Sequence, residues 1–227
     1  MEENKNMTGK EQEERGPESH LAELVTRYPV LEAVKDQILE SYEILKECYE
    51  TGHKVLVAGN GGSAADAEHI VGELMKGFVK RREVPQDFAQ KLWHIDLETG
   101  EELAVKLQGT LPAIALTGHS ALSTAFLNDV DGKLIYAQQV YGYGVEGDIF
   151  LGITTSGNAA NVHYASVTAK AKGMKVIGLT GKDGGKLKHD ADVAIIAPAD
   201  ETYKIQELHL PIYHTLCLML EEHFFAS

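Results

Sequence analysis

Residues 55–73 read VLVAGNGGSAADAEHIVGE, and this stretch decides the fold. The apolar run at residues 55–58 predicts a buried strand, the glycines after it allow a tight turn, and the residues that follow predict a helix. The first N–H groups of such a helix have no partner within the helix, and its dipole favours negative charge beside them. The turn is therefore predicted to bind an anion such as phosphate. It consists of Asn60, Gly61, Gly62 and Ser63.

Glycine is common in strand-to-helix turns for structural reasons alone, so its presence does not identify a phosphate site. Two known nucleotide-binding motifs also contain glycines at such a turn. Gly59, Gly61 and Ala64 have the spacing of a dinucleotide fingerprint, but no second strand ending in an acid follows about 20 residues later. No lysine stands near Ser63, as a P-loop would require. Both nucleotide motifs are excluded.

The helix predicted after this turn carries a possible acid/base pair. His69 and Glu73 are four residues apart and therefore lie on one helix face. A lone His–Glu pair is more often an ordinary hydrogen bond than a functional pair. Its place on the helix that begins at the predicted phosphate turn makes it a candidate for chemistry on a phosphorylated ligand.

Composition limits the class of protein. The chain has 227 residues, 44% of them hydrophobic, which is ordinary for a single well-buried domain. Its formal charge of -13 argues against a nucleic-acid surface, because such surfaces are usually basic. Cys48 and Cys217 lie in apolar helical patterns and are expected to be reduced. With no apolar run long enough for a bilayer and no signal core, the protein is expected in the cytoplasm, without a membrane partner.

The remaining segments suggest a helix-covered parallel sheet. Residues 1–19 are polar and acidic and are expected to be a mobile tail, leaving residues 20–227 as one domain. A heptad-like apolar pattern predicts a long N-terminal helix from Pro29 to about Glu50, which could also pair between subunits. Apolar runs without clean alternation predict strands buried on both faces. They lie near residues 54–58, 112–117, 148–153, 175–180 and 192–197.

Residues 81–110 interrupt this alternation. Their apolar spacing predicts two short helices separated near residues 98–100. A lid, a contact between subunits and simple packing are all compatible with this helical excursion, and nothing in it resembles a catalytic motif.

A second turn has the same character as the first. Thr154, Thr155 and Ser156 follow the strand at residues 148–153, with Gly157 and Asn158 next. Three hydroxyls beside a glycine can donate to phosphate oxygens, whereas Asn158 is expected to cap the following helix. Capping alone explains one of these side chains but not three.

The C-terminal helical stretch provides a third candidate group. Gln206 and His214 are eight residues apart, slightly more than two helical turns, so both can face one site. Pro211 between them is expected to bend the helix. For His209, a hydrogen-bonded structural role is favoured over catalysis.

With these motifs in view, the chain resembles the SIS (sugar isomerase) domain family, and in particular the phosphoheptose isomerases. The resemblance covers roughly residues 20–225 and rests on four motifs in the same order: GNGGSAADAEH, GITTSGNAANV, LTGKDGG and IQELHLPIYH. It implies a three-layer α/β/α sandwich with a flavodoxin-like, five-stranded parallel sheet. It also implies a homotetramer with active sites at the subunit boundaries.

The resemblance further implies a reaction and its binding residues. Phosphoheptose isomerases interconvert sedoheptulose 7-phosphate and D-glycero-D-manno-heptose 7-phosphate. Besides Ser63 in the first turn, the family's substrate positions correspond to Asn60, Gly61, Gly62, Asn128, Asp129, Thr154, Thr155, Ser156 and Gln206. Ala159 stands where a further phosphate-binding serine is usual.

The family's acid/base pair corresponds to Glu73, as the base, and His214. Several members also bind zinc, and the matching positions are His69, Glu73, Gln206 and His214. A carboxylate bound to zinc is a weaker base, so the two roles of Glu73 compete. The alternative is that the metal polarises the substrate carbonyl.

Two other functions are compatible with the resemblance. Some relatives are non-catalytic tetramers that bind a replication-initiator protein, and they resemble this chain around residues 113–129. They lack the glutamate and histidine that this chain has at Glu73 and His214, which favours an enzyme. The other alternative is an isomerase of a different sugar phosphate.

Overall fold

The computed structural model describes residues 16–225 and contains a sheet of five parallel strands. The spatial order is β2-β1-β3-β4-β5. The strands are β1 (Val55–Gly59), β2 (Ala113–Ala115), β3 (Ile149–Thr154), β4 (Lys175–Gly181) and β5 (Val193–Ala197). All five predicted strands are confirmed, and β1 lies between β2 and β3, with Val57 opposite Ala115 on one side and Leu151 on the other.

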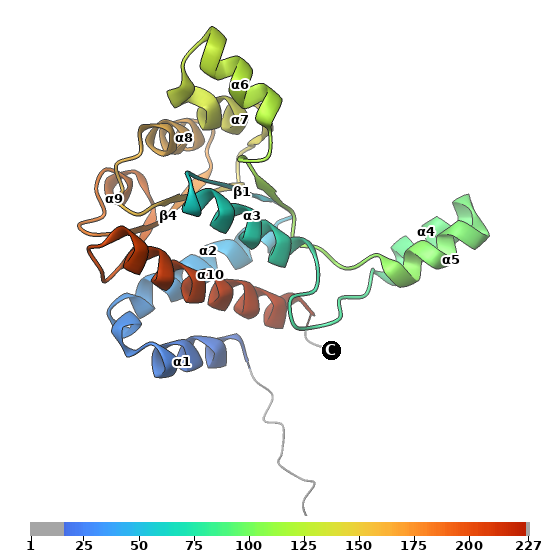
Figure 1. Cartoon of the computed structure of the whole chain (residues 1–227). Coiled ribbons are helices and arrows are strands. Elements are labelled where there is room, and N and C mark those ends of the chain that lie inside the picture. The colour runs from blue at the N-terminus through green and yellow to red at the C-terminus, as the bar shows by residue number, and fades with distance from the viewer. Residues whose placement is uncertain (1–15, 226–227) are drawn as a thin grey trace, which may run out of the picture.

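Helices cover both faces of this sheet and form a three-layer sandwich (Figure 1). Alternate side chains of each central strand enter separate cores: Val57 and Leu151 on one face, Leu56 and Phe150 on the other. The first face packs against α1 (Pro17–Arg27), α2 (Lys35–Glu50), α3 (Gly62–Met75) and α10 (Thr202–Phe225). The second packs against α7 (Ile135–Tyr143), α8 (Ala160–Ala171) and α9 (Leu187–Asp190).

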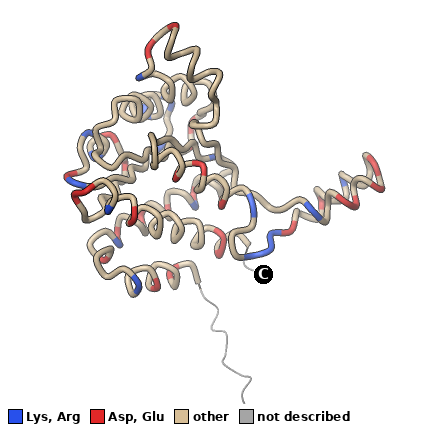
Figure 2. Tube along the Cα trace, in the orientation of Figure 1, with Lys and Arg blue, Asp and Glu red and all other residues tan. Residues whose placement is uncertain are grey.

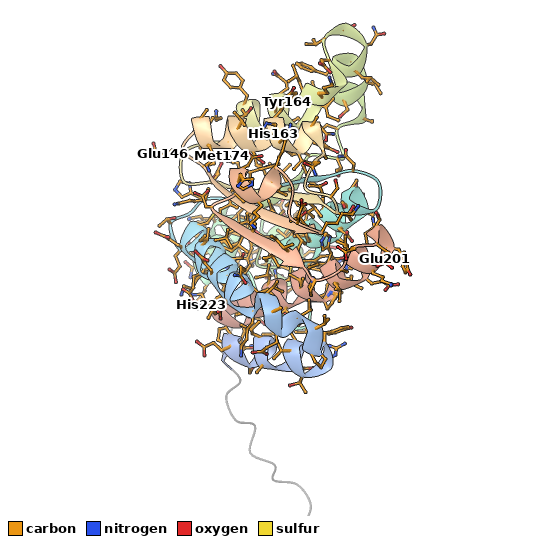
Figure 3. The ribbon with its side chains drawn as sticks, turned by 90° about the vertical axis from the view of Figure 1, so that its left-hand side faces the viewer. Glu146, His163, Tyr164, Met174, Glu201 and His223 are labelled. Atoms are coloured by element: carbon orange, nitrogen blue, oxygen red, sulfur yellow. The ribbon has the colours of Figure 1, made fainter. Side chains whose placement is uncertain are left out.

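The layering is visible edge-on in Figure 3, where His163 and Tyr164 on α8 and His223 on α10 lie on opposite sides of the sheet. The expected three-layer α/β/α architecture is therefore confirmed. None of the helices within residues 16–225 is both long and apolar enough to cross a membrane.

The N-terminal region differs from the prediction in its helix boundaries. Residues 1–15 of the expected tail lie outside the described part of the chain, and residues 17–19 belong to α1. The long helix expected from Pro29 to Glu50 is interrupted, because Pro29–Val34 forms a 3₁₀ helix (η1) before α2 begins. The tighter turn places Leu31 and Val34, three residues apart, in the core. The longest described helix is instead α10, with 24 residues.

The excursion at residues 81–110 forms two helices, as predicted, and they project from the body (Figure 1). We call this pair, α4 (Gln86–Ile95) and α5 (Leu97–Lys106), the arm. The break falls at Asp96 rather than at residues 98–100, because the Asp96 carboxylate accepts the N–H of Thr99 at 2.8 Å and caps α5. Gly100 lies inside α5, where a Cβ would come within 2.6 Å of the Leu92 carbonyl oxygen. The absence of a side chain at Gly100 allows α4 and α5 to approach each other closely.

A buried ion pair fixes the segment between α3 and the arm. The side chains of Arg82 and Glu221 are both fully buried, and Arg82 Nε lies 2.8 Å from Glu221 Oε1. The two terminal guanidinium nitrogens of Arg82 donate to the carbonyl oxygens of Leu74 and Glu73, at 2.8 and 2.9 Å, at the end of α3. Glu221 also accepts the N–H groups of Phe78, Val79 and Lys80.

These donors decide the charge of Glu221. Burial by itself would raise the pKa of this carboxyl, but the N–H groups of Val79 and Phe78 together with Arg82 outweigh burial and lower the pKa. Both members of the pair are therefore charged and hydrogen-bonded, and the loss of either leaves an uncompensated charge in the interior.

Replacement of Arg82 by methionine should consequently destabilise the fold. We expect Arg82→Met to lower the free energy of unfolding by about 3–5 kcal/mol, measured by urea denaturation. Arg27→Met, at an exposed arginine on α1, should change it by less than about 0.5 kcal/mol. The double variant Arg82→Met/Glu221→Leu should recover part of the loss, and a loss below about 1 kcal/mol for Arg82→Met would contradict this account.

His209 is a second buried polar residue with a measurable consequence. It is fully buried on α10, its Nε2 lies 3.1 Å from the Thr180 carbonyl oxygen, and its Nδ1 has no partner among the described residues. Burial lowers its pKa from 6.5 to about 4, which the hydrogen bond to Thr180 only partly opposes. As expected from its sequence context, His209 is hydrogen-bonded within the structure.

This depressed pKa makes stability depend on pH. Below pH 6.5 the unfolded chain takes up a proton at His209, whereas the folded chain stays neutral there until about pH 4. Between pH 7 and pH 5 we expect His209 to cost about 2 kcal/mol of unfolding free energy. His209→Gln keeps a donor for Thr180 without titrating, so urea denaturation of this variant should show a smaller decrease. Equal decreases in both proteins would contradict the prediction.

Candidate active site

The two predicted phosphate turns lie side by side at the topological switch point of the sheet. β1 and β3 are neighbours, and the next strand along the chain after β1 lies on its opposite side, so a crevice opens at their carboxyl ends. The side-chain amides of Asn60, after β1, and Asn161, in the first turn of α8, exchange hydrogen bonds at 2.9 and 2.8 Å. Tyr136 from α7 donates to the Gly59 carbonyl oxygen at 2.6 Å. The first turn is thus held by side chains from α7 and from the start of α8, the helix that follows the second turn.

The first turn has the geometry of an anion cradle. Gly61 adopts φ = 56°, in the left-handed region, and α3 begins at Gly62. Within the described residues no side chain caps α3. The N–H groups of Ser63 and Ala64 already donate to the carbonyl oxygens of Asn60 and Gly61, so those of Gly61 and Gly62 are the ones left for a ligand. Ser63 is buried, and its backbone packs so closely on Gly59 that a Cβ there would lie 2.5 Å from the Ser63 carbonyl oxygen.

Gln206 reaches this cradle from α10. A Cβ added at Gly62 would collide with the side-chain nitrogen of Gln206, so the amide lies directly against the start of α3. A carboxamide at this place can donate to a bound anion alongside the helix N–H groups. The structure therefore places Gln206 with the predicted substrate-binding residues of the first turn.

The second turn packs on the loop after β4. Gly157 has φ = 67°, and a Cβ at this position would collide with the carbonyl oxygen of Gly184. Asn158 does not cap α8 as expected; its side chain bonds to the Ser156 carbonyl oxygen at 2.9 Å and to the Lys186 N–H at 3.3 Å. The asparagine joins two loops because α8 begins only at Ala160.

The three predicted hydroxyls have different surroundings. Thr154 is buried at the end of β3, whereas Thr155 and Ser156 are half-buried in the turn beyond it. The Ser156 hydroxyl accepts the N–H of Asn158 at 3.2 Å, which orients it within the turn. Thr155 and Ser156 are consequently the hydroxyls best placed for a ligand in the crevice.

The acid/base candidates lie farther along α3, where it packs against α10. His69 Nε2 is 3.2 Å from Glu73 Oε1, and Lys76 Nζ is 3.1 Å from the other Glu73 oxygen. His69 Nδ1 is 3.0 Å from the Tyr213 hydroxyl, which also bonds to Asp66 Oδ1 at 3.3 Å. A continuous row of hydrogen bonds therefore runs from Asp66 through Tyr213 and His69 to Glu73.

His214 completes this cluster from α10. Its ring packs edge-on against His69, with centroids 5.0 Å apart, and lies tilted against Phe78, with centroids 5.3 Å apart. Its Nε2 is buried and has no partner in the described part of the chain. Burial, and then the nearby His69, lower the pKa of His214, while Glu73 opposes the shift. A neutral imidazole beside a carboxylate is suited to proton transfer near neutral pH.

Sequence reasoning found part of this arrangement and missed part of it. The expected proximity of His69, Glu73 and His214 is present, but Asp66, Tyr136, Asn161 and Tyr213 were not singled out. Asp66 carried a usable signal, because it precedes His69 by three residues on the same helix. Asn128 and Asp129 end α6 (Ser120–Asp129), where the Asn128 side-chain amide donates to Asp129 Oδ1 at 2.8 Å.

A metal ion would find suitable donor types but no prepared geometry. Within residues 16–225, no group of three or more His, Cys, Asp or Glu side chains is arranged as a metal site. Two imidazoles and the Glu73 carboxylate lie together, and the partnerless Nε2 of His214 is a possible ligand atom. Gln206, by contrast, lies at Gly62, at the start of α3.

The sequence profile of the SIS domain matches residues 21–90 and 102–181. The chain belongs to the SIS domain family. A phosphoheptose isomerase from Nitratiruptor sp. is 38% identical over 195 residues, covering 86% of this chain and 90% of the relative.

Solved structures agree with this assignment. Phosphoheptose isomerases from Francisella tularensis and Neisseria gonorrhoeae superpose with TM-scores of 0.70 and 0.69, at 33% and 30% identity. Each alignment covers 89% of this chain, and 94% and 95% of the respective solved chains. These similarities identify the SIS-domain chain as an isomerase.

The contact between Gly62 and Gln206 allows a test of the cradle. Gly62→Ala must displace the Gln206 amide and crowd the start of α3, so we expect the affinity for a sugar phosphate to fall about tenfold, corresponding to about 1.4 kcal/mol. Gly72→Ala is the matched control on the same helix, because a Cβ there meets no atom within 4 Å. Calorimetric titration with one sugar phosphate would measure both. Equal affinities would remove Gln206 and Gly62 from the binding site.

Proposed function

We propose that this isomerase interconverts a phosphorylated ketose and its aldose, and that its substrates are sedoheptulose 7-phosphate and D-glycero-D-manno-heptose 7-phosphate. One observation carries the reaction class: the His69, Glu73 and His214 cluster lies on the same two helices that form the uncapped, Gln206-bearing cradle. A phosphate held at the start of α3 would direct the rest of the sugar along that helix. The choice of heptose rests on the names of the relatives.

Phosphate binding would use both turns of the switch point. The N–H groups at Gly61 and Gly62 and the hydroxyls of Thr155 and Ser156 provide donors without a cationic side chain. Asn60 would contribute from a position already fixed by Asn161. Asn128 and Asp129 remain predicted substrate contacts, and Ala159 removes the hydroxyl that is usual at its position.

The proposed chemistry proceeds through an enediol. Glu73 would remove the proton from the carbon beside the carbonyl, while His214 would exchange protons with the substrate oxygens. Lys76 and His69 flank the two oxygens of Glu73 and hold its carboxylate in one orientation. The neutral state of His214 allows its ring to donate one proton and accept another.

We also propose zinc as a ligand of this site. His69, Glu73 and His214 would hold it, joined by Gln206 if that side chain moves away from Gly62. Bound zinc would polarise the substrate carbonyl, and it would make Glu73 a weaker base. The support is the donor chemistry and the partnerless His214 nitrogen.

Assembly and location are part of the same proposal. A homotetramer is proposed because α6 has no buried residue and the arm has few, which leaves apolar side chains for contact with other subunits. A cytoplasmic location is supported by Cys48 and Cys217, which are free and buried thiols.

The direct test is conversion of substrate. Purified protein is incubated with sedoheptulose 7-phosphate, with and without added zinc, and formation of the aldose is followed by NMR. We expect conversion, and a dependence on zinc would favour the metal-assisted route. No conversion under either condition would reject the heptose assignment, and the same assay with other ketose phosphates would test the wider class.

The role of Glu73 can be separated from binding. Glu73→Gln removes the base but keeps a similar shape, so we expect turnover to fall at least about 10³-fold while the dissociation constant of the sugar phosphate changes less than about threefold. Glu47→Gln on α2 is the matched control, because its side chain is exposed and on another helix. Turnover of Glu73→Gln near that of the control would exclude Glu73 as the base.

A further inference from the structure

The arm is not stabilised by a core of its own. Its buried residues are only Ala89 and Gly100, and two 10-residue helices are too short to be stable alone in water. Its apolar side chains are largely exposed, reaching 85% for Ile95, 66% for Leu97 and 70% for Val105. The other exposed large apolar side chains of the arm are Phe88, Trp93 and Leu103. Such a surface requires a covering partner.

A cavity lies at the root of the same arm. It has a volume of about 980 Å³ and is open to solvent between the segment at residues 77–84 and the two arm helices. Apolar walls come from both sides, including Phe78, Val79, Trp93 and Val105. Its charged lining consists of four basic residues and two acids, so the cavity combines apolar walls with a net positive charge; these residues are Lys80, Arg81, Arg82, Lys106, Glu83 and Glu101.

Charge is distributed unevenly along the arm (Figure 2). Residues 94–100, at and beside its tip, include Asp96 and Glu98 and no lysine or arginine. The root segment at residues 76–84 has four basic residues and one acid. Lys80 is paired within its own chain to Glu222, whereas Arg81 is 74% exposed and its Nε lies 3.8 Å from Glu83 Oε1. An acidic, apolar tip and a basic, apolar cavity therefore belong to one arm.

We propose that the arm binds the arm of a second copy of this chain, antiparallel, with each tip in the root cavity of the other. A two-fold interface places the same surface on both subunits, so it must be complementary to itself. Antiparallel arms satisfy this condition, because the tip of each arm, around Ile95 and Leu97, meets the root cavity of the other arm, around Arg81. The net charge of -13 makes two copies of the chain repel each other, which disfavours unspecific association. The association of two arms would therefore depend on the local complementarity between tip and cavity.

The family comparison sets this contact apart from the common domain. The SIS profile matches residues 21–90 and 102–181 and leaves out residues 91–101, which form the outer half of the arm. The outer half of the arm thus lies outside the part of the chain that the profile matches. The arm contact is one surface of the homotetramer proposed above, and it does not depend on the reaction. The mass of the assembly tests the arm contact, whereas turnover of substrate tests the reaction.

The first test changes the apolar tip at Ile95 and the apolar cavity wall at Val105. Ile95→Glu and Val105→Glu alter exposed side chains, so both variants should fold, which circular dichroism and the urea midpoint would verify. Sedimentation equilibrium should show at least a tenfold weaker subunit association for each. Val167→Glu on α8 is the control, with 51% exposure outside the arm, and should associate like the unchanged protein. Unaltered association of the arm variants, or a monomeric unchanged protein at micromolar concentration, would overturn the proposal and leave the arm for another partner.

The second test uses the symmetry of the contact. Arg81→Glu and Glu98→Arg each place like charges together in both halves of a two-fold interface, so each variant alone should associate at least tenfold more weakly. Mixed in equal amounts, they restore opposite charges in both halves and should form a one-to-one complex, detected by native mass spectrometry of a mass-labelled variant. A mixture that associates no better than its components would reject the antiparallel arrangement.

Discussion

The buried contact between Arg82 and Glu221 is the interaction on which the site and the arm both depend. One guanidinium joins the carboxylate on α10 to the last carbonyl groups of α3, including that of Glu73. The carboxylate in turn binds three successive N–H groups of the segment that leads to the arm. A buried ion pair is stable only if nearly all of its hydrogen bonds are satisfied. The relative positions of α3, α10 and the segment that leads to the arm are therefore fixed together.

This contact explains how a helical insertion can coexist with a working site. An insertion directly after the helix that carries Glu73 would otherwise loosen the end of that helix. Here the chain leaves α3, is fixed by Arg82 and Glu221, and only then enters the arm. The side chains that face the proposed substrate are thus insulated from whatever the arm contacts.

Much of the architecture could be predicted from sequence because it depends on local patterns. Strands covered on both faces are continuous apolar runs, and the turns after β1 and β3 contain glycine and hydroxyl residues that their geometry requires. Features that depend on distant partners could not be predicted. Arg82 and Glu221 are 139 residues apart, and neither the Tyr213–His69 contact nor the Asn60–Asn161 pair has a periodic signal. The break between α4 and α5 lies at Asp96 and not at the predicted residues 98–100, where Gly100 suggests a turn. Gly100 instead lies inside α5, where its small size allows close contact with α4.

The reciprocal amide bonds between Asn60 and Asn161 have a thermodynamic consequence for ligand binding. They join the turn after β1 to the first turn of α8 before any ligand arrives, so the loss of conformational freedom in these two segments is incurred during folding rather than on association. A ligand that enters the crevice meets donors already in place, and more of its contact energy remains for affinity or for distortion toward a reactive shape. The paired asparagines thus make the crevice rigid in advance, at the expense of tolerance for ligands of other shapes.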